Sequence, residues 1–153
     1  IKVFQEDTRQ LDLFLTNKVD MVVTSPPYCF AVDFNKYFRL SYYWFNWDIS
    51  FYKDNEIGAR SKRGKKSALD DYFTEMEQSI SVISRVLKSE RYCCFTLGNS
   101  TRSKKSINTV KEIISIAKSK GLLLVLNTDR FLSQQTMAQK RIPKESVLVF
   151  RNS

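Results

Sequence analysis

The chain has 153 residues, 42% apolar and 27% charged, which is enough for one domain with a hydrophobic core and argues against disorder throughout. It contains no histidine and three cysteines without a CxxC pair, which excludes a zinc site, a Ser–His–Asp triad and a histidine general base within this chain. The formal net charge of +9 favours a polyanionic partner, nucleic acid first, although a basic surface without such a partner would have the same charge.

The hydropathy pattern indicates a protein without a membrane segment. No run approaches the roughly 18 apolar residues of a membrane span, and no signal peptide precedes the first predicted strand. The odd number of cysteines, two of them adjacent, favours reduced thiols in a cytoplasmic protein. Because the chain begins at Ile1 almost directly in a strand-like run, we expect a processed or partial chain.

Two short strands and a short helix are predicted in the first 24 residues. Residues 1–5 have the pattern of a strand, and Leu11, Phe14 and Leu15 have helical spacing. Residues 20–24, DMVVT, are typical of a buried strand that is apolar on both faces, and this strand ends at the sequence SPPY.

The next segment is first rich in aromatic residues and then rich in basic residues. Residues 30–57 are dense in aromatic side chains and permit a helix; they could stack bases or wall a pocket, but a core or interface cluster is the commoner meaning. Residues 58–66, GARSKRGKK, carry five basic side chains and two glycines, which is typical of a mobile, solvated loop.

The second half predicts two amphipathic helices among strands. The first helix can be capped by Ser67, and its apolar stripe consists of Leu69, Tyr72, Phe73, Met76, Ile80, Ile83 and Leu87. The second covers 107–117 and is closed by Gly121, while strands are predicted at 91–97, 122–127 and 146–150. This alternation favours an α/β fold with a mostly parallel sheet, and the last two strands are expected as an antiparallel pair at its edge.

Ser25, Pro26, Pro27 and Tyr28 form a stiff turn, here called the hook, directly after the strand at 20–24. Ligands of open α/β sheets bind beyond the carboxyl ends of strands, where this hook lies. Prolines fix the backbone and donate no hydrogen bonds, so the hook offers carbonyl acceptors, the Ser25 hydroxyl and the flat ring of Tyr28. Such a site suits an exocyclic amino group whose ring is stacked, and a base from a duplex must be flipped out to reach it.

The segment VDMVVTSPPYCFAVDF resembles the catalytic motif of S-adenosylmethionine-dependent DNA amino-methyltransferases, in which Asp, Asn or Ser precedes Pro-Pro and an aromatic residue. AVDFNKYFRLSYYWF, GLLLVLNTDR and KESVLVF are similar to later segments of one bacterial and archaeal group, so the resemblance spans most of the chain. It implies a class I methyltransferase (Rossmann-like) fold, S-adenosylmethionine as cofactor and DNA as partner, as in DNA methylation by restriction–modification enzymes.

The resemblance also implies a role for each residue of the hook. Ser25 and the Pro26 carbonyl would accept hydrogen bonds from the target amine, Pro27 would keep the hook rigid, and Tyr28 would stack on the flipped base. The serine form of the motif is associated most with cytosine N4. A plain proline turn that closes a strand remains the alternative.

The glycine-rich cofactor loop of this family is missing. Gly58, Gly64, Gly98 and Gly121 are too far apart to form a GxG turn. The family sheet runs 3-2-1-4-5-7-6, and the chain lacks strands between 1–5 and 20–24. We therefore expect residues 1–153 to be a single catalytic half-domain that needs a missing segment or a second chain. Asp7 ends the presumed strand 3 and would contact the cofactor adenine, unless it is a helix cap.

Other residues are weaker candidates. The basic side chains of the loop at 58–66 are expected to contact DNA phosphates, unless they are only solvated: Arg60, Lys62, Arg63, Lys65 and Lys66. Lys104 and Lys105 are similar but weaker, and Cys29, Cys93 and Cys94 are expected to be packing residues. The alternatives to a cytosine-N4 DNA methyltransferase are adenine N6 methylation, RNA methylation, and a non-catalytic nucleic-acid-binding subunit or remnant.

Overall fold

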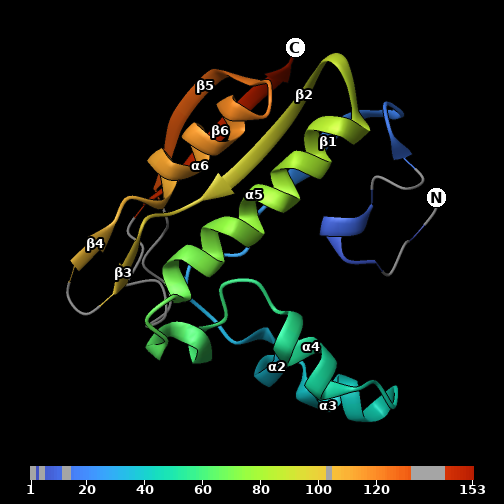
Figure 1. Cartoon of the computed structure of the whole chain (residues 1–153), viewed down its shortest axis with the longest axis vertical. Helices are drawn as coiled ribbons and strands as arrows, with labels where there is room; N and C mark the ends of the chain where they lie inside the picture. The colour runs from blue at the N-terminus through green and yellow to red at the C-terminus, as the bar shows by residue number, and fades with distance from the viewer. Residues whose placement is uncertain (1–2, 4–5, 12–14, 103–104, 132–143) are drawn as a thin grey trace.

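In a computed structural model, which describes residues 3, 6–11, 15–102, 105–131 and 144–153, the chain forms one main sheet with two long helices on one face. Three short helices extend away from one end of this sheet (Figure 1). They are α2 (Phe34–Tyr37), α3 (Arg39–Trp44) and α4 (Ile49–Asn55). No helix in the described part of the chain is long and apolar enough to cross a membrane.

The sheet has four strands in the order β1-β2-β6-β5. These are β1 (Val19–Thr24), β2 (Leu87–Leu97), β5 (Leu122–Phe131) and β6 (Lys144–Asn152). β1 and β2 are parallel, whereas β6 is antiparallel to both of its neighbours, β2 and β5.

The prediction of a mostly parallel sheet is therefore wrong. β1, β2 and β5 run in one direction, as alternating strands and helices predict, but β6 is inserted between β2 and β5 and reverses two of the three pairings. The antiparallel pair of the last two strands does form, although only β5 lies at the edge. The order β1-β2-β6-β5 corresponds to strands 4-5-7-6 of the sheet that the resemblance implied.

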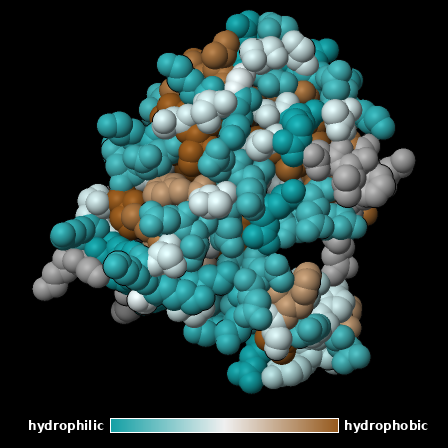
Figure 2. Space-filling model, viewed as in Figure 1, coloured by the Kyte–Doolittle hydropathy of each residue, from teal (hydrophilic) through white to brown (hydrophobic). Residues whose placement is uncertain are grey.

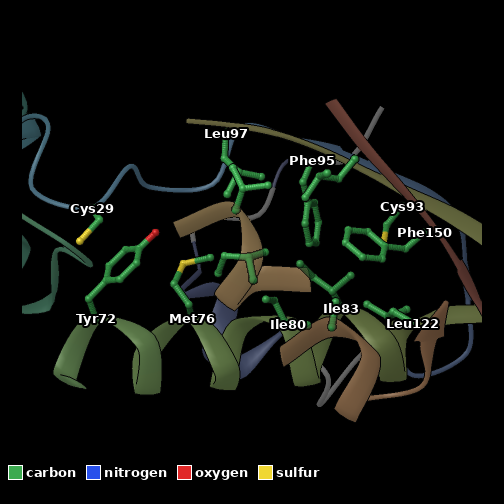
Figure 3. Packing of buried hydrophobic residues seen from close by; sticks show 14 of the residues in the cluster. Cys29, Tyr72, Met76, Ile80, Ile83, Cys93, Phe95, Leu97, Leu122 and Phe150 are labelled. Atoms are coloured by element: carbon green, nitrogen blue, oxygen red, sulfur yellow. The ribbon is translucent and has the colours of Figure 1, made fainter. Parts of the chain in front are cut away.

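The predicted helical stripe forms the centre of the core. On α5 (Ala68–Val86), Tyr72, Met76, Ile80 and Ile83 are buried as predicted and face the sheet (Figure 3). Alternate residues of β2, which include the free thiol Cys93, point toward them, and α6 (Thr109–Ser119) packs beside α5. Residues three or four apart on α5 share one face of the helix, and every second residue of β2 shares one face of the strand. These two faces pack against each other, so the helix and the strand belong to one core.

Several elements differ from the sequence predictions. The prediction for residues 1–5 lies largely outside the described residues, as does most of the helix around Leu11; the structure describes a 3₁₀ helix, η1 (Thr8–Gln10). Residues 58–66 contain a second one, η2 (Arg60–Gly64), and an unpredicted hairpin joins β3 (Ser100–Arg102) to β4 (Lys105–Ile107). The strand at 20–24 is half-buried on one face and exposed on the other, where Met21 and Val23 are 61% and 69% exposed.

Candidate active site

The hook follows β1 at one edge of the sheet, where several strand ends meet. The carboxyl ends of β1, β2 and β5 share this edge with the start of β6, because Leu97 pairs with Ser146 and Phe131 with Lys144. Side chains from residues far apart in the sequence therefore surround the hook. The sequence prediction that the hook lies at a carboxyl edge is confirmed.

The backbone directly after Pro26 is held by hydrogen bonds on three successive carbonyls. The buried Tyr72 donates its hydroxyl to the Pro27 carbonyl at 2.9 Å. The Ala31 amide donates to the Tyr28 carbonyl at 3.2 Å. The Ser100 hydroxyl donates to the Cys29 carbonyl at 2.6 Å. These contacts fix the exit of the hook between α5 and β3.

The first two residues of the hook, Ser25 and Pro26, are not held by such hydrogen bonds from other described residues. The Ser25 hydroxyl and the Pro26 carbonyl receive no hydrogen bond from any described residue, and Ser25 is exposed whereas Pro26 is buried. These are the two acceptors that the resemblance assigned to the target amine. The structure therefore leaves them without an internal donor, next to carbonyls whose donors are already in place.

Gly58 supports the backbone that follows the hook. Its carbonyl accepts the Phe30 amide at 2.9 Å, and its backbone has φ +64°, a conformation that glycine adopts readily. A Cβ at this position would lie 2.8 Å from the Tyr72 ring. Gly58 thus lets the chain approach Tyr72 closely, a role that the sequence alone did not reveal.

The ring of Tyr28 is half-buried and anchored through its hydroxyl. The hydroxyl donates to Glu145 Oε1 at 2.6 Å, and Glu145 Oε2 accepts from Arg130 at 2.5 Å. Burial, together with the hydrogen bond to Glu145, raises the pKa of Tyr28 far above its ordinary value, so the hydroxyl remains a donor. Sequence reasoning missed Glu145 and Arg130; the only available signal was a carboxylate at the start of an otherwise apolar strand.

The basic loop is only partly available to a ligand. Lys62 donates to the carbonyls of Asp54 at 2.8 Å and Glu56 at 2.7 Å, and so holds the end of α4. The Lys65 side chain donates no hydrogen bond to a carbonyl among the described residues, and the Lys65 carbonyl accepts from Arg102. The remaining basic side chains of the loop are exposed or half-buried: Arg60, Arg63 and Lys66.

A cleft lies between this loop, α5 and Phe30, which follows the hook. It has a volume of about 490 Å³ and is lined by Lys62 and Lys65 of the loop, by Phe30 after the hook and by Tyr72 and Glu75 of α5. The basic loop thus lies next to Phe30, two residues after the hook, whereas the four residues of the hook do not line this cleft. Burial raises the pKa of Glu75 in this cleft.

Asp7 is engaged locally. Its carboxylate accepts hydrogen bonds from the backbone amide and the guanidinium of Arg9, so Asp7 caps η1. The hydrogen bonds from Arg9 hold the pKa of Asp7 below its usual range. Arg9 also contacts Glu75 at 3.4 Å and the Asn55 carbonyl at 3.3 Å. The geometry is therefore that of the helix cap, the alternative that the sequence left open.

The aromatic segment is mostly on the surface. On α2 and α3, Tyr37, Leu40 and Trp44 are 75%, 83% and 85% exposed. Tyr42 stacks on Tyr52 with ring centroids 4.8 Å apart. Phe30 alone belongs to the buried core cluster, so this segment is a projecting aromatic arm and not part of the core.

Comparison with known proteins identifies the fold. No family model and no curated protein matches the sequence. A protein of Thermus thermophilus, provisionally assigned as a DNA modification methylase, matches in structure with a TM-score of 0.60 and 14% identity. That match covers 96% of this chain and 52% of the other. The complex of that protein with S-adenosyl-L-methionine matches with a TM-score of 0.59 at 15% identity over 95% and 51% of the two chains.

A more distant match has the same character. An S-adenosylmethionine-dependent methyltransferase of Methanosarcina mazei matches with a TM-score of 0.51 and 12% identity, over 96% of this chain and 65% of the other. The chain spans about half the length of the Thermus structures. The fold of its described elements is therefore similar to part of these methyltransferase structures.

Proposed function

We propose that this chain is the catalytic half of a DNA methyltransferase that acts on an exocyclic base amine, with cytosine N4 favoured. The observation that carries the proposal is the division of acceptors at the hook. The carbonyls of Pro27, Tyr28 and Cys29 have internal donors, whereas the Ser25 hydroxyl and the Pro26 carbonyl have none among the described residues.

The proposed chemistry follows from these acceptors. Two acceptors at the entry of the hook would bind the two hydrogens of an amino group, and the Tyr28 ring would stack on the base. An aromatic amine is a poor nucleophile because its lone pair is delocalised into the ring. Hydrogen bonds that favour a pyramidal nitrogen localise that pair and direct it away from the hook. The base must leave the duplex to adopt this position.

The described residues do not by themselves make a site for S-adenosylmethionine. The four glycines are too widely separated for a GxG turn, and Gly58 packs closely against the Tyr72 ring. The Asp7 carboxylate is engaged by Arg9. We therefore propose that a further segment or a second chain holds the cofactor, and that Asp7 contributes there only if Arg9 releases it.

A methylation assay tests this function. The complete protein, or this chain with the segment that bears the glycine loop, is incubated with DNA and S-adenosylmethionine labelled in its methyl group. Digestion of the DNA to nucleosides then identifies the product. N4-methyldeoxycytidine supports the proposal, N6-methyldeoxyadenosine supports the adenine alternative, and transfer only to RNA supports RNA methylation.

A non-catalytic nucleic-acid-binding subunit is the second candidate function. The exposed aromatic arm and the net charge of +9 favour it, since aromatic faces and cations together bind single strands. Binding of nucleic acid without transfer to any base, in the presence of the cofactor segment, would support this candidate over the enzyme.

A further inference from the structure

Three residues from three strand ends meet at the Tyr28 ring. Tyr28 follows β1, Glu145 begins β6, and Arg130 lies near the end of β5 directly opposite Glu145 in the strand register. Among the described residues, each Glu145 oxygen has one partner, the Tyr28 hydroxyl at 2.6 Å and the Arg130 guanidinium at 2.5 Å. Glu145 is 7% exposed, so its carboxylate has been removed almost entirely from water.

This burial argues for a specific task. A carboxylate is costly to bury unless it is paired and hydrogen-bonded, and an exposed cross-strand pair with Arg130 would not require that burial. Arg130 itself is 59% exposed in its side chain. Glu145 thus points inward from a cross-strand ion pair, toward the hydroxyl of Tyr28.

We propose that Glu145, oriented by Arg130, is a positioning residue that sets the plane of the Tyr28 ring for base stacking. This inference rests on the proposed function. A tyrosine ring has only two side-chain torsions, and a hydrogen bond at its far end fixes both when the backbone is held at Pro27 and Cys29. The stacking face is then in place before a base arrives, which lowers the ordering cost of binding.

The test measures binding of single-stranded DNA, which removes the cost of base flipping. The probe is a fluorescein-labelled oligonucleotide of mixed sequence, titrated with the full 153-residue chain. Tyr28→Phe keeps the ring and removes the hydroxyl, and Glu145→Ala removes the acceptor. We expect each to weaken binding about three- to tenfold, as for the loss of one hydrogen bond. The double variant should be no weaker than either single variant.

Conservative variants separate positioning from folding. Glu145→Gln keeps an acceptor oxygen and should bind within about twofold of the wild type, provided that thermal melts show a folded chain. Glu90→Ala is the matched control, because Glu90 pairs with Arg151 at 2.9 Å on the same sheet but away from the hook. It should leave DNA binding unchanged.

Tyr28→Ala distinguishes the two levels of the proposal. Loss of binding in Tyr28→Ala, with wild-type binding in folded Tyr28→Phe and Glu145→Ala, would overturn the positioning role and leave the proposed function standing. Unchanged binding in Tyr28→Ala would overturn the stacking site itself. Additive losses in the double variant would show that Glu145 does not act through Tyr28.

Discussion

At the scale of single residues, internal hydrogen bonds fix the exit of the hook, whereas the two acceptors at its entry have no donor among the described residues. Tyr72, Ser100 and Gly58 hold the backbone from Pro27 onward, whereas Ser25 remains exposed with its hydroxyl unpaired among the described residues. Rigid support beside free acceptors is the arrangement that a binding site requires, because the acceptors are then held in place before the ligand arrives.

Substitutions at Tyr28 and Ser25 should separate binding from chemistry if the proposed methyltransferase activity is correct. Tyr28→Ala removes the stacking face and should cost about 1–3 kcal/mol in base binding. Ser25→Ala removes an acceptor for the amine and should lower turnover more than DNA affinity. Steady-state methylation and DNA titration measure both effects. Wild-type rates in both variants would rule out the assigned roles.

Gly58→Ala should destabilise the protein at the close contact between Gly58 and Tyr72 that supports the hook. The added Cβ meets the Tyr72 ring at 2.8 Å in a backbone with φ +64°, so strain and overpacking add. We expect a loss of about 2–4 kcal/mol in unfolding free energy, measured by urea denaturation. Gly64→Ala is the control, since nothing lies within 4 Å of its Cβ. Equal stability of the two variants would contradict this role of Gly58.

At the scale of elements, the basic loop divides into a structural and an available part. Lys62 hydrogen-bonds to two carbonyls at the end of α4, which a lysine near a helix C-terminus does favourably. Arg60, Lys65 and Lys66 are exposed, and of these three Lys65 lines the cleft beside α5. Helix η2 therefore presents its cations from an ordered turn, not from the solvated loop that the sequence predicted.

Replacing Arg60, Arg63, Lys65 and Lys66 together by Gln should weaken DNA binding for all sequences. Each lost phosphate contact should reduce the slope of log K against log salt concentration by about 0.9. Lys62→Gln should instead lower the melting temperature and leave that slope nearly unchanged. The slopes come from titrations at several salt concentrations. An unaltered slope in the fourfold variant would show that these side chains are only solvated.

At the scale of the whole molecule, one face of the sheet is covered and the other is exposed. α5 and α6 both pack on the covered face (Figure 1), and the helix side of the molecule is mainly hydrophilic (Figure 2). On the opposite face, Met21, Tyr92 and Leu123 lie in one row across the strands and are 61%, 45% and 41% exposed. β1 also pairs with β2 alone among the described strands.

We expect that residues 1–153 do not bind S-adenosylmethionine without the additional segment proposed above. Calorimetric titration of residues 1–153 with S-adenosylmethionine should show no binding in the micromolar range, because no glycine turn is present to offer backbone amides. A segment that carries this turn should restore binding when it is added. Micromolar affinity of the chain alone would require a cofactor site among residues that we have not assigned.

The free edge should also make the isolated chain self-associate. Exposed apolar edge strands recruit other strands unless charges interrupt them. Met21→Lys with Val23→Lys should therefore increase the monomeric fraction in size-exclusion chromatography, while Asp20→Asn should not. A wild-type chain that is already monomeric at high concentration would contradict this expectation.

Local patterns in the sequence determined α5, β1 and the position of the hook. Apolar spacing along α5 and the Pro-Pro pair after β1 act within a few residues, so their consequences follow from short-range geometry. The sequence also indicated the methyltransferase-like α/β fold, because the motif around SPPY is visible in the order of residues. It indicated the missing glycine turn, because the spacing of the four glycines is visible there too.

The tertiary structure alone decided the insertion of β6 and the surroundings of the hook. Placing β6 between β2 and β5 is a long-range choice that no local period records. The same insertion brings Glu145 to the hydroxyl of Tyr28, 117 residues earlier in the chain. The contacts of the Tyr72 hydroxyl with the Pro27 carbonyl and of the Ser100 hydroxyl with the Cys29 carbonyl were likewise decided by the fold, because they join residues 45 and 71 positions apart in the sequence.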